Sequence, residues 1–253
     1  MTKRIACTIA LVFLLAPAAA FAQIHQVGTA SGSTSDRRNT FNFSLGYIGL
    51  KGLDSRSSDL CGTSYCDVLA ADLLSEHPLL FTISDLNGAI GGGEYLFAIN
   101  RRLEAGVGVS FAQRLVPSIY ADLTHSAGDE IQQDVKLRQI PVSFTARYLI
   151  LPRGSRVEPY VGAGLVEIRY HYSEVGEFVD ADGTIFPGSY VTDGVASGPV
   201  VLAGVRAPVS NWTVGGELRW QGAKAKNLLQ EGFLGDTLDL GTWQINFTAG
   251  IRF

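Results

Sequence analysis

Residues 240–253 read LGTWQINFTAGIRF, and this stretch decides the fold because its side chains alternate between two kinds. In a β-strand successive side chains point to opposite faces, so Trp243, Ile245, Phe247 and Ile251 share one face and polar residues share the other. An apolar face with no obvious element to cover it predicts a strand that contacts lipid. Strands cross a bilayer only in closed barrels, because every backbone N–H and C=O must be paired there.

The amino-terminal residues predict export. Lys3 and Arg4 form a basic region, residues 9–15 form an apolar core too short to span a membrane, and Ala20-Phe21-Ala22 matches a signal-peptidase site. We therefore expect a cleaved signal peptide over residues 1–22, with Gln23 starting the mature chain.

Composition narrows the class further. No segment has eighteen or more uninterrupted apolar residues, which excludes a helical membrane protein. The net charge is -4 and basic residues are not concentrated, so we expect no nucleic-acid partner. Residues 23–40 are small and polar and predict a flexible periplasmic lead, and residues 41–253 predict a single barrel domain in the outer membrane.

Eight segments have strand character, and their spacing predicts how they connect. The connections are alternately long and short, about 37, 3, 21, 7, 25, 3 and 17 residues, as in membrane barrels with short periplasmic turns and long external loops. The sequence thus predicts an all-β fold, an eight-stranded antiparallel up-and-down transmembrane β-barrel. The expected strands are 41–50, 88–98, 102–116, 138–150, 158–172, 198–208, 212–222 and 240–253.

The fifth expected strand departs from simple alternation. Val161, Ala163 and Leu165 share one parity, whereas Ile168 and Tyr170 share the other. An extra residue near Val166 would be a β-bulge that restores the lipid face above it, so we expect a bulge there.

Charged side chains occupy the parity opposite the aromatics, which predicts that they point into the barrel. An arginine facing lipid at mid-bilayer would cost about 2–4 kcal/mol. Eight strands enclose only enough space for side chains to fill, so we expect a lumen plugged by ion pairs rather than an open pore. A narrow path for small solutes gated by the same pairs is the alternative. The expected interior charge network is Glu94, Glu104, Arg147, Glu167, Arg169, Arg206, Glu217, Arg219 and Arg252.

The first external loop contains two cysteines five residues apart. An oxidising compartment favours a disulfide between Cys61 and Cys66 over a metal site, for which the spacing matches no known pattern. Residues 67–76 could form a short helix over the barrel mouth, and residues 79–84 could extend the first hairpin. We expect no metal and no cofactor.

A catalytic alternative rests on His171 and Ser173, which lie two residues apart and share one face of a strand. A histidine that activates a serine is the minimum for acyl transfer. The spacing resembles the catalytic strand of the outer-membrane lipid A deacylases, but Glu174 stands where that family has asparagine. The family motif also lies near the carboxyl terminus, and the expected bulge turns His171 inward. We therefore expect no enzyme.

Several segments resemble the outer-membrane β-barrel family of OmpA-, OmpX- and OmpW-like proteins, among them residues 103–111, residues 158–164 and Ala249-Gly250-Ile251-Arg252-Phe253. The terminal Phe253 also resembles the sorting signal of outer-membrane barrels. The resemblance implies a monomeric barrel with a structural or surface-binding role, or else a narrow OmpW-like conduit for small molecules. Its implied partners are outer-membrane lipid, lipopolysaccharide and, through the carboxyl-terminal strand, the barrel-assembly machinery.

Overall fold

The computed structural model describes residues 37–51, 79–179, 183–231, 233 and 237–253. The expected signal peptide, the Cys61–Cys66 disulfide and the helix over residues 67–76 lie outside these residues, as does the expected periplasmic lead up to residue 36. None of the helices in the described part is long and apolar enough to cross a membrane.

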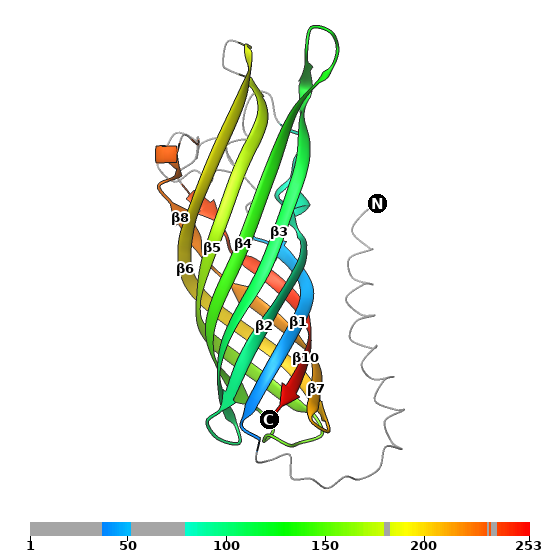
Figure 1. The fold of residues 1–253 in the computed structure, drawn as a ribbon, viewed down its shortest axis with the longest axis vertical. Helices are drawn as coiled ribbons and strands as arrows, with labels where there is room; N and C mark the ends of the chain where they lie inside the picture. The colour runs from blue at the N-terminus through cyan, green and yellow to red at the C-terminus, as the bar shows by residue number, and fades with distance from the viewer. Residues whose placement is uncertain (1–36, 52–78, 180–182, 232, 234–236) are drawn as a thin grey trace. The chain divides into compact units, whose positions relative to one another are not determined.

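Eight antiparallel strands close into a barrel in which each strand pairs with its neighbour in sequence, and the last strand pairs with the first (Figure 1). The predicted eight-stranded up-and-down barrel is therefore confirmed. The barrel strands are β1 (Asn39–Leu50), β2 (Gly88–Ala98), β3 (Leu103–Thr124), β4 (Glu130–Leu149), β5 (Glu158–Val179), β6 (Ile185–Val209), β7 (Trp212–Gln221) and β10 (Thr242–Arg252). Two short strands, β8 (Lys224–Lys226) and β9 (Thr237–Asp239), pair separately, and η4 (Ile83–Leu86) and η5 (Leu228–Glu231) are single 3-10 turns.

Four strands are about twice as long as the others. β3, β4, β5 and β6 have 20 to 25 residues, whereas β1, β2, β7 and β10 have 10 to 12. The long strands continue beyond the barrel as a tall wall, visible at the top of Figure 1. We call this the long-strand end, and the opposite end, which holds residues 99–102, 150–157 and 210–211, the short-turn end.

The lengths expected for two external loops were wrong. The connections after β3 and β5 were expected to be 21 and 25 residues long, but only residues 125–129 and 180–184 separate the strands. The alternation of aromatic and small residues stops at the ends of the expected strands. Backbone pairing nevertheless continues, from Gln133 opposite Gly176 to Val179 opposite Ile185.

The expected bulge near Val166 is also wrong. β5 pairs in one unbroken register with β4 from Tyr160 to Gly176 and with β6 from Glu158 to Val179. The register shift that does occur lies in β3, between Ile119 and Thr124.

The parity change in β5 instead marks the point at which the apolar side chains pass from the outer face of the strand to its inner face. Before Val166, the side chains of Val161, Ala163 and Leu165 point outward, and Leu165 is 68% exposed. From Val166 onward Val166, Ile168, Tyr170 and Tyr172 point inward and are buried, while polar side chains point outward. Where the outer face meets water instead of lipid, the apolar residues must turn to the inside to form a core.

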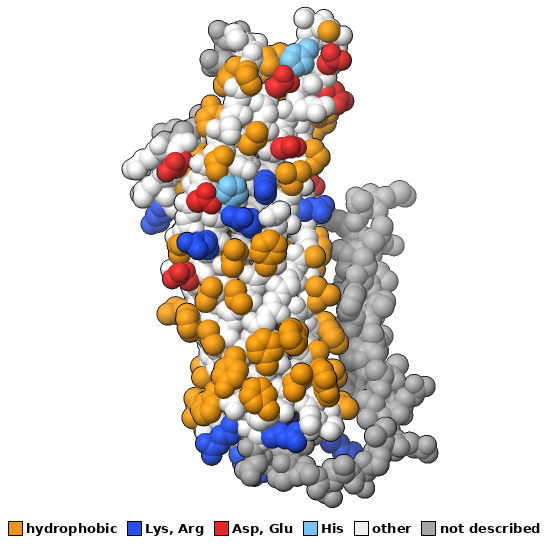
Figure 2. Space-filling view, viewed as in Figure 1, with side chains coloured by type: hydrophobic (Ala, Val, Ile, Leu, Met, Phe, Trp, Pro, Cys, Tyr) orange, Lys and Arg blue, Asp and Glu red, His pale blue; other side chains and the backbone are white. Residues whose placement is uncertain are grey.

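Apolar side chains form a belt around the outside of the barrel at its short-turn half. In Figure 2 this belt covers the lower half of the visible face, with Lys and Arg at its lower edge and again above it. Such a belt is the lipid-facing surface of a transmembrane barrel. Its large members include Phe43, Leu45, Tyr47, Phe111, Phe144, Tyr148, Trp212, Leu218, Trp243, Ile245 and Phe247, each at least 47% exposed.

Candidate functional site in the barrel lumen

The lumen at the level of the apolar belt contains two groups of paired charges. The central cluster consists of Glu94 from β2, Arg147 from β4, and Glu217 and Arg219 from β7. Arg147 donates from Nη2 to Glu94 and to Glu217 Oε2 at 2.8 Å, and Arg219 Nε donates to Glu217 Oε1 at 2.9 Å. Arg147 is 1% exposed, so its charge is balanced by carboxylates rather than by solvent.

The basal cluster lies closer to the short-turn end and consists of Glu104, Arg153, Glu158, Arg206 and Arg252. Arg206 joins its two carboxylates, donating from Nη2 to Glu104 Oε1 at 2.6 Å and from Nε to Glu158 Oε2 at 2.8 Å. Arg252 binds Glu158, and Arg153 binds Glu104. Through Arg252 and Glu158, the last barrel strand is tied to β5 across the lumen.

Arg153 reaches the basal cluster from the turn between β4 and β5. Its Nη2 also donates to the Thr40 hydroxyl at 2.9 Å and to the Arg37 carbonyl at 2.8 Å, which anchors the beginning of β1. Burial lowers the pKa of this guanidinium, while the Glu104 carboxylate acts in the opposite direction.

Tyr160 connects the two clusters. Its ring lies 4.8 Å from the guanidinium carbon of Arg147 in the central cluster and 5.8 Å from that of Arg206 in the basal cluster. Its hydroxyl donates to Glu217 Oε2 at 3.0 Å. Cations over an aromatic face are stabilised by the ring quadrupole, so this one side chain contacts both cationic groups and one carboxylate.

Glycines make room for these large side chains. A Cβ atom on Gly204 would lie 2.5 Å from the Tyr160 hydroxyl oxygen and 2.7 Å from the Gly216 carbonyl oxygen. The high glycine content of the inward face is thus a packing requirement of the charged lumen.

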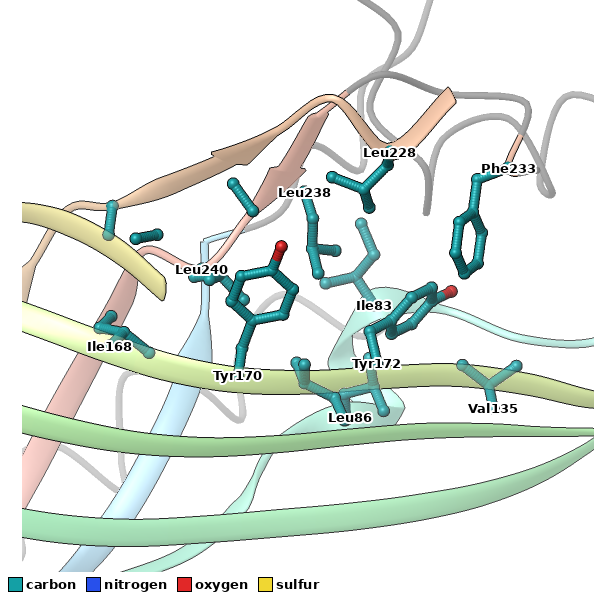
Figure 3. Close-up of a cluster of buried hydrophobic side chains, with 14 of the residues drawn as sticks. Ile83, Leu86, Val135, Ile168, Tyr170, Tyr172, Leu228, Phe233, Leu238 and Leu240 are labelled. Atoms are coloured by element: carbon teal, nitrogen blue, oxygen red, sulfur yellow. The ribbon is translucent and has the colours of Figure 1, made fainter. Parts of the chain in front are cut away.

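Above the central cluster the interior becomes apolar. The start of segment 79–86 pairs with β3, through a bridge from Leu79 to Tyr120 and a hydrogen bond from Leu80 N–H to the Ile119 carbonyl, and η4 then places Ile83 and Leu86 inside. From the other side, Leu238 of β9 and Leu228 of η5 pack on Tyr170 and Tyr172 of β5 (Figure 3). We call this group the apolar layer; it also contains Leu79, Phe81, Val135, Leu137, Val166, Ile168, Ala196, Val200, Ala223, Ala225, Phe233 and Leu240.

The structure brings together seven of the nine residues expected in the interior network: Glu94, Glu104, Arg147, Arg206, Glu217, Arg219 and Arg252. The inward placement of Glu167 and Arg169 was wrong. Both are exposed on the outer face, because β5 has no bulge to turn them inward.

Three members of the lumen were missed from the sequence. Glu158 and Tyr160 have the inward parity of Gly162 and Gly164, so the alternation of β5 contained a usable signal. Arg153 lies in a turn, where no periodicity indicates the direction of a side chain.

The inward orientation expected for His171 was wrong for the same reason as that of Arg169. His171 lies on the outer face of β5, and its Nδ1 is 2.8 Å from Asp193 Oδ1 on β6. Ser173 shares this face but is only 6% exposed, and no hydrogen bond joins it to His171 among the described side chains. Within the described ranges no three His, Cys, Asp or Glu side chains are grouped as a metal site would require.

Phe253 lies at the seam where the barrel closes. Its backbone N–H donates to the Asn39 carbonyl at 3.0 Å and the Asn39 N–H returns a bond of 3.1 Å to Phe253, while the Phe253 side chain is exposed.

An eight-stranded antiparallel barrel with an apolar outer belt and a polar lumen defines the class of small transmembrane β-barrels. No family model and no curated protein matches the sequence. Among solved structures, the chain is similar to the outer membrane protein OprG from Pseudomonas aeruginosa, with 11% identity and a TM-score of 0.47 over 87% of this chain and 98% of that one. It is also similar to Neisserial surface protein A, with 14% identity and a TM-score of 0.44 over 85% and 96%. Outer Membrane Protein W of E. coli matches with 16% identity and a TM-score of 0.38 over 86% and 100%. These likenesses concern the fold.

Proposed function

We propose that this chain is a monomeric bacterial outer-membrane β-barrel with a structural or surface-binding role, whose lumen is filled by its own side chains and which performs no catalysis. The observation that carries the proposal is the stacking of two charge clusters and an apolar layer inside one lipid-facing barrel. The partners are outer-membrane lipid, lipopolysaccharide and the barrel-assembly machinery.

The charges of the lumen support a filled interior because they are nearly balanced and bind one another. Five arginines face four glutamates, and each of these nine side chains takes part in at least one ion pair. An ion in transit would have to separate such buried pairs, and breaking a buried pair costs about 3–5 kcal/mol. The apolar layer adds a second barrier, because most of its side chains are hydrocarbon.

Planar-bilayer recording tests the filled lumen. The wild type should show no discrete conductance, and Glu217→Ala or Arg206→Ala should introduce flickering current only if the apolar layer opens as well. Steady single-channel conductance of the wild type would overturn the filled lumen and support the narrow conduit.

A requirement for detergent tests the membrane location separately. The belt residues should drive aggregation of the refolded barrel when detergent is removed, and lipid vesicles should prevent it. A folded protein that stays dispersed without detergent or lipid would refute a membrane barrel altogether.

One specific observation favours an acyl hydrolase as a second candidate. The unbroken register of β5 places His171 and Ser173 outward, and the Asp193 carboxylate lies at His171 Nδ1, as in an acid–histidine pair that orients a base. Its test is the lipid A acyl pattern of cells that overproduce the protein. The hydrolase would be supported if cells that overproduce the wild type lose one acyl chain of lipid A and cells that overproduce either His171→Ala or Ser173→Ala keep it. An unchanged pattern with the wild type would exclude the hydrolase.

A further inference from the structure

We propose that Lys136 and Arg138 of β4 and Arg169 of β5 form a binding site on the outer wall of the barrel for the phosphate groups of outer-leaflet lipid. We call these three residues the basic patch. The proposal extends the membrane location proposed above by naming the lipid chemistry that one face would recognise.

The basic patch lies directly above the lipid-facing belt. On β4 the outward residues are apolar from Tyr148 to Ile140, and Arg138 and Lys136 come next. Ten residues separate Tyr148 from Arg138, which at about 3.3 Å per residue and a tilt of about 40° is a rise of roughly 25 Å, the height of the apolar band. Figure 2 shows Lys and Arg side chains at this level, with some Asp and Glu side chains beside them and others nearer the top of the wall.

The register brings the three cations together. Ile140 pairs with Arg169 and Arg138 pairs with His171, so Arg138 and Arg169 are diagonal neighbours on one face. Such neighbours lie about 7–8 Å apart, with somewhat shorter Cβ–Cβ separations, and two arginines can close this distance around one phosphate. Lys136 is the next outward residue of β4 and is opposite Ser173.

The cations are not neutralised by the protein. Among the described residues, Lys136, Arg138 and Arg169 make no ion pair, and the flanking outward acids Asp134 and Glu167 make none with them. The Asp193 carboxylate, opposite His171 on β6, is paired with His171. Three unpaired like charges on one face repel one another, and an anion bound between them removes that repulsion.

Binding of labelled lipopolysaccharide to the detergent-solubilised protein tests the site. The probes are bis-phosphorylated lipopolysaccharide, the same material after enzymatic removal of its phosphates, and inorganic phosphate as competitor. The test variant is Lys136→Gln/Arg138→Gln/Arg169→Gln, and the matched control is Arg38→Gln/Arg101→Gln/Arg156→Gln, which removes three cations from the short-turn end.

The wild type and the control should bind phosphorylated lipopolysaccharide tighter than the dephosphorylated form, and the patch variant should lose affinity by roughly 10- to 100-fold. Equal affinity of wild type and patch variant, or no preference for the phosphorylated form, would overturn the site. If inorganic phosphate displaces the lipid at a concentration equal to that of the lipid, the ligand is free phosphate and not the lipid. This outcome would also overturn the proposal.

Circular dichroism and heat-modifiable gel mobility report whether each variant is a folded barrel. If the wild type is folded and depends on detergent but does not prefer the phosphorylated lipid, only the proposal of the basic patch fails. If the wild type needs no detergent, the proposed membrane function itself fails.

Discussion

The Tyr160 hydroxyl donates a hydrogen bond of 3.0 Å to Glu217, and Arg147 donates to the same carboxylate oxygen at 2.8 Å. One glutamate from β7 thus holds side chains of β4 and β5 across the lumen. Because Tyr160 also contacts Arg206, we expect the central and basal clusters to lose stability together when this contact is changed.

Replacement of Glu217 by glutamine should destabilise the barrel more than replacement of Tyr160 by phenylalanine. Glu217→Gln leaves Arg147 and Arg219 without one of their carboxylates, at a cost of about 3–5 kcal/mol. Tyr160→Phe removes one hydrogen bond to a charged group, at a cost of about 1.5–3 kcal/mol. Urea unfolding in phospholipid vesicles measures both. Tyr47→Phe, on the lipid-facing side, is the control and should change little; equal costs for Glu217→Gln and Tyr47→Phe would contradict the role of the cluster.

Gly204→Ala should destabilise the barrel by about 1–3 kcal/mol through overpacking, because its Cβ would lie 2.5 Å from Tyr160. Gly216→Ala is a matched control on the neighbouring strand, where the nearest atom to a new Cβ is the Asn246 carbonyl oxygen at 3.8 Å. The cost of Gly204→Ala should shrink in a Tyr160→Ala background. Independent, additive costs of the two substitutions would show that the clash is not with Tyr160.

Leu238→Ala should loosen the apolar layer without unfolding the barrel below it. Leu238 is fully buried on the short strand β9, and truncation of such a leucine typically costs about 2–5 kcal/mol. Hydrogen exchange should accelerate in β8, β9 and segment 79–86, while amides of β1 and β10 remain protected. Lys226→Ala, exposed on β8, should leave the exchange unchanged; faster exchange throughout the barrel would mean that the layer and the barrel are one cooperative unit.

Phe253→Ala should impair assembly in cells while leaving refolding in detergent nearly unchanged. The Phe253 side chain is exposed and contributes mainly its backbone to the seam, so its side chain is available for recognition by assembly machinery. The measurement is the folded fraction in isolated membranes beside the refolded fraction in vitro, with Phe247→Ala as an equally exposed aromatic control. Equal assembly of wild type and Phe253→Ala would contradict a sorting role.

Oxidation of Cys61 and Cys66 remains a prediction that mass spectrometry can check. The mature chain should show no alkylation of either cysteine before reduction and alkylation of both after it. Alkylation without reduction would exclude the disulfide.

Sequence alternation predicted most of the barrel because lipid imposes a strict pattern on the residues that contact it. A strand that crosses the membrane must present apolar side chains outward at every second position, as in residues 242–252, and all eight strands were located within a few residues where this rule applies. The inward parity also placed Arg147, Glu217 and Arg252 inside, since the lipid face excludes them.

Tertiary structure decided which side chains point inward in the parts of the strands beyond the apolar belt. The parity change at Val166 is compatible with a bulge or with an unbroken strand that leaves the lipid, and only the register with β4 and β6 separates the two. That choice turned Arg169 and His171 outward and Tyr170 inward. The entry of Arg153, Leu228 and Leu238 into the interior likewise depends on turns and short elements, because a side chain there is directed by packing against distant strands and not by local periodicity.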